Sequence, residues 1–180
     1  MKRYIVTGTP GAGKTSIIRG LAARGYAVVE EAATDVIADL HAAGKDQPWT
    51  DPEFTGRIVA VQRQRQETAP GAAVQFYDRS PICTLALAHY LGHPVTEVLA
   101  AEVDRVLRDD IYQRRVFFVR PLGFVTPTAA RRITLAESME FERVHEQVYR
   151  AHGYELVDIP KGEVTDRTAM IDRYVRSWAQ

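Results

Sequence analysis

One stretch near the N-terminus combines glycines, a lysine and a hydroxyl at a fixed spacing. Residues 8–15 have the sequence Gly-Thr-Pro-Gly-Ala-Gly-Lys-Thr, which matches the phosphate-binding loop (P-loop) pattern G-x-x-x-x-G-K-[ST] at every fixed position. Glycines let such a loop curl so that successive backbone N–H groups point at phosphate oxygens. The helix that follows adds the partial positive charge of its N-terminus. The stretch therefore predicts a site for the phosphates of a nucleoside triphosphate.

Each position of the loop has a predicted task. Lys14 would reach the β- and γ-phosphates of ATP and act in catalysis, and the Thr15 hydroxyl would bind Mg²⁺. The alternative is a glycine-rich turn that binds nothing, but a short apolar run before the loop and a helical pattern after it supply the context that the motif requires. The predicted nucleotide contacts are Thr9, Pro10, Gly11, Ala12, Gly13, Lys14, Thr15 and Ser16.

An Asp-Arg pair follows the third apolar run of the chain. Asp78 has the position of a carboxylate that binds Mg²⁺ directly or through water, although it could instead cap a helix starting near Pro81. Arg79 could offer two parallel N–H groups to phosphate or substrate oxygens, with a surface ion pair as the alternative. In an open α/β sheet the carboxyl ends of the strands form the ligand site, so we expect both side chains beside the P-loop.

Two further pairs of charged residues are candidates for catalysis. Glu30 and Glu31 close the second apolar run, and because consecutive strand residues point to opposite faces, only one can serve as general base. The pattern alone leaves that choice open. Arg131 and Arg132 lie in a segment without apolar periodicity, where either could swing onto the transferred phosphoryl group or remain solvated. Arg131 is assigned to nucleotide binding and Arg132 to catalysis.

These residues must be positioned by alternating strands and helices. Short apolar runs alternate with helix-length segments, which predicts an α/β fold with a mostly parallel sheet. We expect one P-loop NTPase-like domain over residues 1–180, with three αβα layers, five parallel strands and a lid-like segment at about 121–136. The predicted strands are 2–7, 26–29, 73–77, 116–119 and 154–159. The predicted helices include 14–23, 95–108 and 165–178, one beginning at the cap Asp51, and one beginning at the capping box Thr134–Glu137.

Composition narrows the function further. The 180 residues include 23 basic and 23 acidic side chains, so net charge gives no support for binding nucleic acid or an anionic membrane. No stretch approaches the ~18–20 apolar residues of a membrane span. The single cysteine, Cys83, fits a reducing cytoplasm, and its apolar neighbours favour a core position over a nucleophile. We expect a cytoplasmic protein and have no prediction for a protein partner.

Taken together, the P-loop, the sequence Glu31-Ala32-Ala33 and the sequence Asp78-Arg79-Ser80 resemble small P-loop kinases of the nucleoside and nucleotide kinase type. The likeness is closer to compact AAA-domain ATP-binding proteins related to nicotinamide riboside kinases, and it spans essentially the whole chain. It implies that the P-loop strand lies near the centre of the sheet and that Glu31 is the base or binds the acceptor. It also implies that Arg132 is a lid arginine and that residues after Pro160 approach the adenine.

The resemblance leads to a specific functional hypothesis with two alternatives. We expect an ATP- and Mg²⁺-dependent kinase that transfers the γ-phosphate to a small nucleoside-like or other hydroxyl metabolite. The first alternative is a nucleotide-dependent regulatory ATPase that acts through a protein partner. The second is a polynucleotide 5′-kinase, which the neutral net charge disfavours. The chain lacks the hydrophobic-run-Asp-Glu motif and the sensor region of ring-forming AAA machines, so the name of that domain family does not predict a hexameric motor.

Overall fold

The computed structural model describes residues 1–123 and 133–178. Its strands form one five-stranded sheet in the order β2-β3-β1-β4-β5, and every neighbouring pair is parallel. The strands are β1 (Lys2–Thr7), β2 (Ala27–Val29), β3 (Val74–Asp78), β4 (Arg115–Val119) and β5 (Glu155–Ile159). The predicted α/β fold with five parallel strands is confirmed, and β1, which leads into the P-loop, is the central strand.

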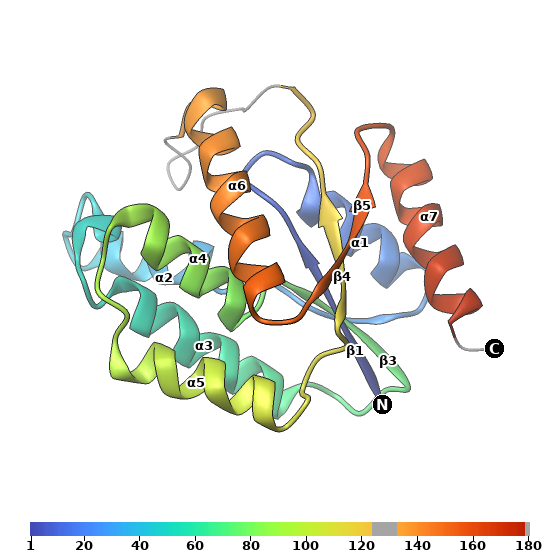
Figure 1. Ribbon diagram of the computed structural model, residues 1–180, viewed down its shortest axis with the longest axis horizontal. Helices are drawn as coiled ribbons and strands as arrows, with labels where there is room; N and C mark the ends of the chain where they lie inside the picture. Colours follow the sequence, from blue (N-terminus) through green and yellow to red (C-terminus); the bar gives the residue numbers. More distant parts are fainter. Residues whose placement is uncertain (124–132, 179–180) are drawn as a thin grey trace.

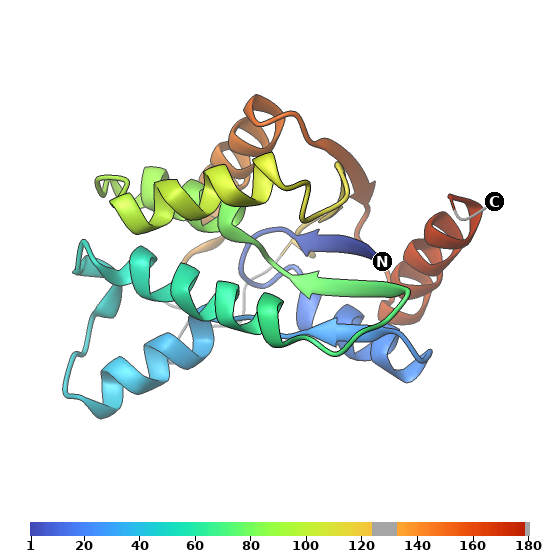
Figure 2. The same ribbon diagram turned by 90° about the horizontal axis from the view of Figure 1, so that it is seen from below.

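Helices cover both faces of this sheet (Figures 1 and 2). The helices are α1 (Lys14–Ala23), α2 (Ala33–Ala42), α3 (Phe54–Thr68), α4 (Pro81–Leu91), α5 (Glu97–Arg108), α6 (Leu135–Ala151) and α7 (Val164–Ser177), with a short 3₁₀ helix, η1 (Pro48–Thr50). Helices α1 and α7 pack on one face, and α4, α5 and α6 pack on the other. The predicted three-layer αβα arrangement follows.

Strand periodicity creates the two cores. On β1, Tyr4 and Val6 belong to the cluster under α1 and α7, whereas Ile5 belongs to the cluster under α4, α5 and α6. Successive strand residues point to opposite faces, so the part of a strand that is covered on both sides must be continuously apolar, as residues 4–6 of β1 and 116–119 of β4 are. A third, smaller cluster joins α2 to α3 beside the sheet.

Two local predictions were wrong. The continuously apolar run from Tyr26 to Val29 predicts a strand covered on both faces, but β2 is an edge strand whose three residues are only half-buried. Asp51 was expected to cap a helix, but α3 begins at Phe54 with Glu53 as its N-cap residue, and Asp51 instead follows the end of η1. Asp51 accepts a hydrogen bond from the Glu53 backbone and pairs with Lys45 instead.

The entry into α6 follows the prediction. The Thr134 side chain accepts a hydrogen bond from the Glu137 backbone, and the Glu137 carboxylate accepts one from the Thr134 backbone. This reciprocal pair satisfies two N–H groups at the start of the helix. Most of the expected lid segment, including Arg131 and Arg132, lies outside the described residues.

Candidate active site

The P-loop joins β1 to α1, and at its first position, Gly8, the backbone conformation and the space available permit only glycine. Gly8 has φ 137°, and a Cβ there would lie 2.4 Å from the carbonyl oxygen of Val119 on β4. Gly11 and Gly13 also have positive φ, at 85° and 86°, a region that L side chains rarely adopt. The glycine spacing of the motif is therefore set by a close approach to β4 and by the curl of the loop.

The predicted loop residues divide into two groups. Pro10, Gly11, Gly13, Lys14, Thr15 and Ser16 line a cavity of about 820 Å³. The Thr9 and Ala12 side chains are buried, with 0 % exposure, so these residues can meet a phosphate only through their backbones. The Lys14 Nζ donates a hydrogen bond to the Thr9 carbonyl oxygen at 2.8 Å. Burial, with the charge on Arg79, lowers the pKa of Lys14 to about 8.

Glu31 and Arg79 form an ion pair at the edge of the sheet where the carboxyl ends of β2 and β3 lie. The Arg79 Nε donates to a Glu31 carboxylate oxygen at 2.5 Å, and the Thr34 hydroxyl donates to the other oxygen at 2.9 Å. Burial would raise the pKa of Glu31, but the charges of Arg79 and Lys14 outweigh it and hold the pKa at about 2. Glu30 is exposed and lies at the rim of the same cavity, so the geometry places Glu31 nearer to the P-loop lysine and Arg79.

Asp78 is the last residue of β3 and a buried carboxylate. Its Oδ1 has no hydrogen-bond partner among the described residues, and burial raises its pKa to about 6 despite the nearby charge of Lys14. Ser80, not Asp78, is the N-cap residue of α4, so the capping alternative for Asp78 is wrong. Asp78 also lines the cavity, and a buried carboxylate oxygen without a hydrogen-bond partner is a fitting ligand for a cation.

The same observation tests the fit of Mg²⁺. Across residues 1–123 and 133–178, no three His, Cys, Asp or Glu side chains gather into a protein-only metal site. Mg²⁺ in nucleotide sites is held by one or two protein oxygens, waters and substrate phosphates. Asp78 and the exposed Thr15 hydroxyl, which both line the cavity, are compatible with that mode.

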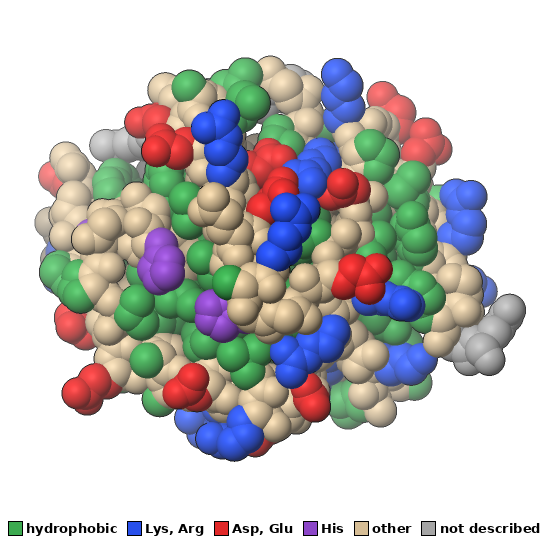
Figure 3. Space-filling view, in the orientation of Figure 1, with side chains coloured by type: hydrophobic (Ala, Val, Ile, Leu, Met, Phe, Trp, Pro, Cys, Tyr) green, Lys and Arg blue, Asp and Glu red, His purple; other side chains and the backbone are tan. Residues whose placement is uncertain are grey.

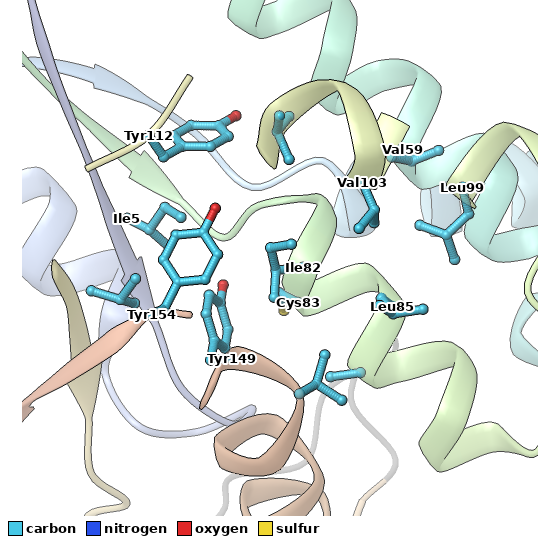
Figure 4. Packing of buried hydrophobic residues seen from close by; sticks show 14 of the residues in the cluster. Ile5, Val59, Ile82, Cys83, Leu85, Leu99, Val103, Tyr112, Tyr149 and Tyr154 are labelled. Carbon is cyan, nitrogen blue, oxygen red and sulfur yellow. The ribbon is translucent and has the colours of Figure 1, made fainter. Parts of the chain in front are cut away.

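A buried Cys–His pair, not singled out in the sequence, lies behind Arg79. Cys83 packs in the core beside Ile82 on α4 (Figure 4), as predicted, but its Sγ also accepts a hydrogen bond from Arg79 Nη1 at 3.2 Å. The His145 Nε2 on α6 lies 2.9 Å from this sulfur. Burial, with the charges of Arg79 and Lys14, lowers the pKa of His145 well below 6.5, so the imidazole is neutral at pH 7.

The cavity extends from the P-loop to an apolar chamber between α2, α3, α4 and α6. The side chains that line this chamber are Ile37, Trp49, Phe54, Ile58, Leu87, Tyr90, Leu91 and Phe141. Within it, Gln62 on α3 accepts a hydrogen bond from the Thr84 hydroxyl at 2.9 Å. Other polar residues of α3 point elsewhere: Arg65 donates to the carbonyl oxygens of Glu30 and Glu31. Of the polar residues of α3, Gln62 alone lines the described part of the cavity.

Surface features agree with the charge balance of the sequence. Acidic and basic side chains are interspersed over the face that carries α6 (Figure 3), and neither charge forms a large continuous patch on this face. In the described part of the chain, no helix is both long enough and apolar enough to cross a bilayer.

The fold and motif have counterparts among known proteins. Residues 3–167 match the family model described as AAA domain. Deoxyadenosine kinase from M. mycoides with bound dCTP superposes with a TM-score of 0.65 at 15% identity, covering 98% of this chain and 100% of that chain. The same kinase with dCMP product and a flexible dCDP gives a TM-score of 0.63 at 14% identity, covering 97% and 99%.

A second kind of neighbour is the NadR protein in complex with NAD and AMP-PNP. It superposes with a TM-score of 0.67 at 18% identity, covering 96% of this chain and 48% of that chain. None of the curated proteins matches the sequence. At these identities the superpositions establish a shared fold, that of small P-loop kinases.

Proposed function

The chain belongs to the AAA domain family, and from that premise we propose that it is a kinase transferring the γ-phosphate of ATP to a hydroxyl of a small, nucleoside-like metabolite. The observation that carries the proposal is one continuous cavity of about 820 Å³ that runs from the P-loop, past Glu31 and Arg79, into an apolar chamber. A nucleotide switch needs the first part of that cavity. Only an enzyme with a second substrate needs the chamber.

The chamber favours a flat, partly aromatic acceptor. Aromatic side chains at its wall include Tyr90 and Phe141, whose ring centroids lie 4.8 Å apart. Ligand pockets of this kind combine an apolar lining with a few polar groups that fix orientation. Gln62, held by Thr84, is such a group, and a nucleobase-like ring with polar edges suits this combination.

The polar residues between the two parts of the cavity have roles in the transfer step. The acceptor hydroxyl oxygen forms a bond to the γ-phosphorus, the bond to the β,γ-bridging oxygen breaks, and ADP leaves. The Glu31 carboxylate accepts the proton of the hydroxyl. Lys14 and Arg79 neutralise charge on the phosphoryl oxygens, so positioning and electrostatics supply most of the catalysis. Arg131 and Arg132, outside the described residues, remain candidates for the same charge.

Asp78 and Thr15 would hold Mg²⁺ in this scheme. When bound, the ion would supply positive charge that offsets the negative charge of the phosphates. Burial lowers the pKa of Lys14 to about 8, and a phosphate that took the place of the Thr9 carbonyl would favour the charged form of the lysine.

The test is a metabolite-library screen with ATP and Mg²⁺ that follows ADP release above the background without acceptor. We expect one chemical class, nucleosides or close relatives, to stimulate release, and Lys14→Ala to abolish the stimulation while retaining the fold by circular dichroism. Stimulation by protein fractions, but by none of the metabolites, would favour the regulatory ATPase. Wild-type turnover in Lys14→Ala would exclude this site for either reaction.

A further inference from the structure

A buried arginine with no role in the proposed transfer lies directly behind the P-loop. Arg167, on the first turn of α7, is 2 % exposed. Its Nη1 donates a hydrogen bond to the Ala12 carbonyl oxygen at 2.7 Å, and its Nη2 donates to the Arg120 carbonyl oxygen at 2.9 Å. The guanidinium therefore connects the P-loop to the end of β4 by backbone contacts alone.

The charge of this guanidinium is uncompensated. Within residues 1–123 and 133–178, Arg167 forms no ion pair, and its Nε has no hydrogen-bond partner. Burial lowers its pKa from 12.5. A buried cation without an anionic partner is costly. The neighbouring Arg120 shows the contrast, since it pairs with Glu142, Glu146 and Asp158.

The contact to Ala12 also fixes the direction of a phosphate-binding group. The described part of the chain contains no cis peptide bond, and in a trans peptide the C=O and the following N–H point in opposite directions. Because Arg167 holds the Ala12 carbonyl on the α7 side, the Gly13 N–H points the other way. Gly13 itself lines the cavity. A Cβ on Gly13 would lie 3.2 Å from Arg167 Nη1, so the glycine leaves room for the guanidinium.

We propose that Arg167 is a positioning residue of the nucleotide site, which orients the Ala12–Gly13 peptide toward bound phosphate and whose buried charge is offset by that phosphate. This inference rests on the nucleotide binding in the proposed function and is independent of the acceptor. Two consequences follow. Loss of the guanidinium lowers the affinity of the protein for a nucleoside triphosphate more than its affinity for a monophosphate. Nucleotide also stabilises the wild-type protein more than it stabilises a variant without the charge.

The experiment measures ATP and AMP dissociation constants by titration calorimetry, with melting temperatures, for Arg167→Gln and Arg167→Lys. Glutamine keeps an N–H₂ donor but no charge, and we expect ATP affinity to fall at least about tenfold, the equivalent of one charge-assisted hydrogen bond. Arg167→Lys keeps the charge and should recover part of this loss. The matched control is Arg105→Met, which removes another largely buried arginine, one paired with Glu102 away from the cavity. It should lower the melting temperature and leave ATP affinity unchanged.

The outcomes separate this inference from the proposed function. If Arg167→Gln folds and binds ATP within about twofold of wild type, the inference is overturned and the proposed function stands. If Arg167→Gln does not fold, Arg167→Lys carries the test: weaker ATP binding with unchanged AMP binding supports the positioning role, and equal loss for both nucleotides overturns it. If the wild-type protein binds neither nucleotide, the proposed function fails and the inference fails with it.

Discussion

The substitution Glu31→Gln tests the proposed base and its ion pair together. Glutamine keeps the shape of the side chain and an oxygen that can accept from Arg79 Nε, which lies 2.5 Å from the carboxylate in the wild-type protein. It removes the negative charge and the ability to take up a proton. The adjacent Glu30→Gln is the matched control, because Glu30 lies at the same cavity but is exposed.

The size of the effect on stability follows from the pKa of Glu31. A pKa of about 2 instead of 4.5 corresponds to about 3 kcal/mol in favour of the ionised carboxylate, at about 1.4 kcal/mol per pKa unit. The group has a depressed pKa in the folded protein, so this contribution is present above pH 4.5 and is lost as the pH falls toward 2. We expect Glu31→Gln to lower the free energy of unfolding by about 1–3 kcal/mol at pH 7, since its oxygen retains part of the contact.

The effect on transfer should be larger than the effect on nucleotide binding. Loss of a general base typically costs ~10²–10⁴-fold in rate, whereas removing a negative charge beside Lys14 and Arg79 should leave ATP affinity equal or higher. The assays are urea unfolding, titration calorimetry with ATP, and ADP release with the acceptor found in the screen. An unchanged kcat in Glu31→Gln, or an equal loss in Glu30→Gln, would refute the assignment of the base.

Two further predictions concern buried ionisable groups. Asp78→Asn should raise the Mg²⁺ concentration needed for half-maximal transfer at least about tenfold in a metal titration. The same substitution should stabilise the metal-free protein at pH 7. Burial raises the pKa of Asp78 to about 6, so the carboxylate that is ionised at pH 7 opposes folding. That gain should shrink as the pH falls from 6 toward 3.8, and a less stable variant at pH 7 would contradict it. His145→Gln should make the free energy of unfolding less sensitive to acid. Burial lowers the pKa of His145 below 6.5, so the unfolded state binds a proton that the folded state excludes. Below pH 6.5 this difference lowers the free energy of unfolding of the wild-type protein by up to about 1.4 kcal/mol per pH unit. The measurement is urea unfolding between pH 5 and 7.5. The prediction is disproved if the free energy of unfolding changes with pH equally in the variant and in the wild-type protein.

Local patterns in the sequence predicted most of the fold. The bounds expected for β1 and α1 agree with Lys2–Thr7 and Lys14–Ala23, because the P-loop fixes where a strand ends and a helix begins. The Thr134–Glu137 capping box also formed as expected. The exposure of β2 was missed, since an apolar run does not reveal whether its strand lies at the centre or the edge of a sheet. That property depends on the strand order, which is decided by packing across the whole chain.

The placement of the candidate site residues was predictable only where these residues follow strands. Asp78, Arg79 and Glu31 were expected beside the P-loop because the carboxyl ends of parallel strands share one edge, and all three line the same cavity as the P-loop; their roles stay predictions. Arg167 donates to a carbonyl 155 positions away, and His145 contacts a cysteine 62 positions away. Neither contact has a local spacing rule, since both side chains come from the interior faces of helices.

The four charged groups of the site suggest an order of events. Lys14 and Arg79 are opposed by Glu31 and Asp78, so the free site has two formal positive and two formal negative charges. While Arg79 holds Glu31, the low pKa of about 2 makes that carboxylate a weak base. Phosphate oxygens compete for a guanidinium with the same paired geometry as a carboxylate. In the proposed transfer, a bound triphosphate that draws Arg79 away would raise the basicity of Glu31, and Glu31 would then act as a competent base only when ATP is present.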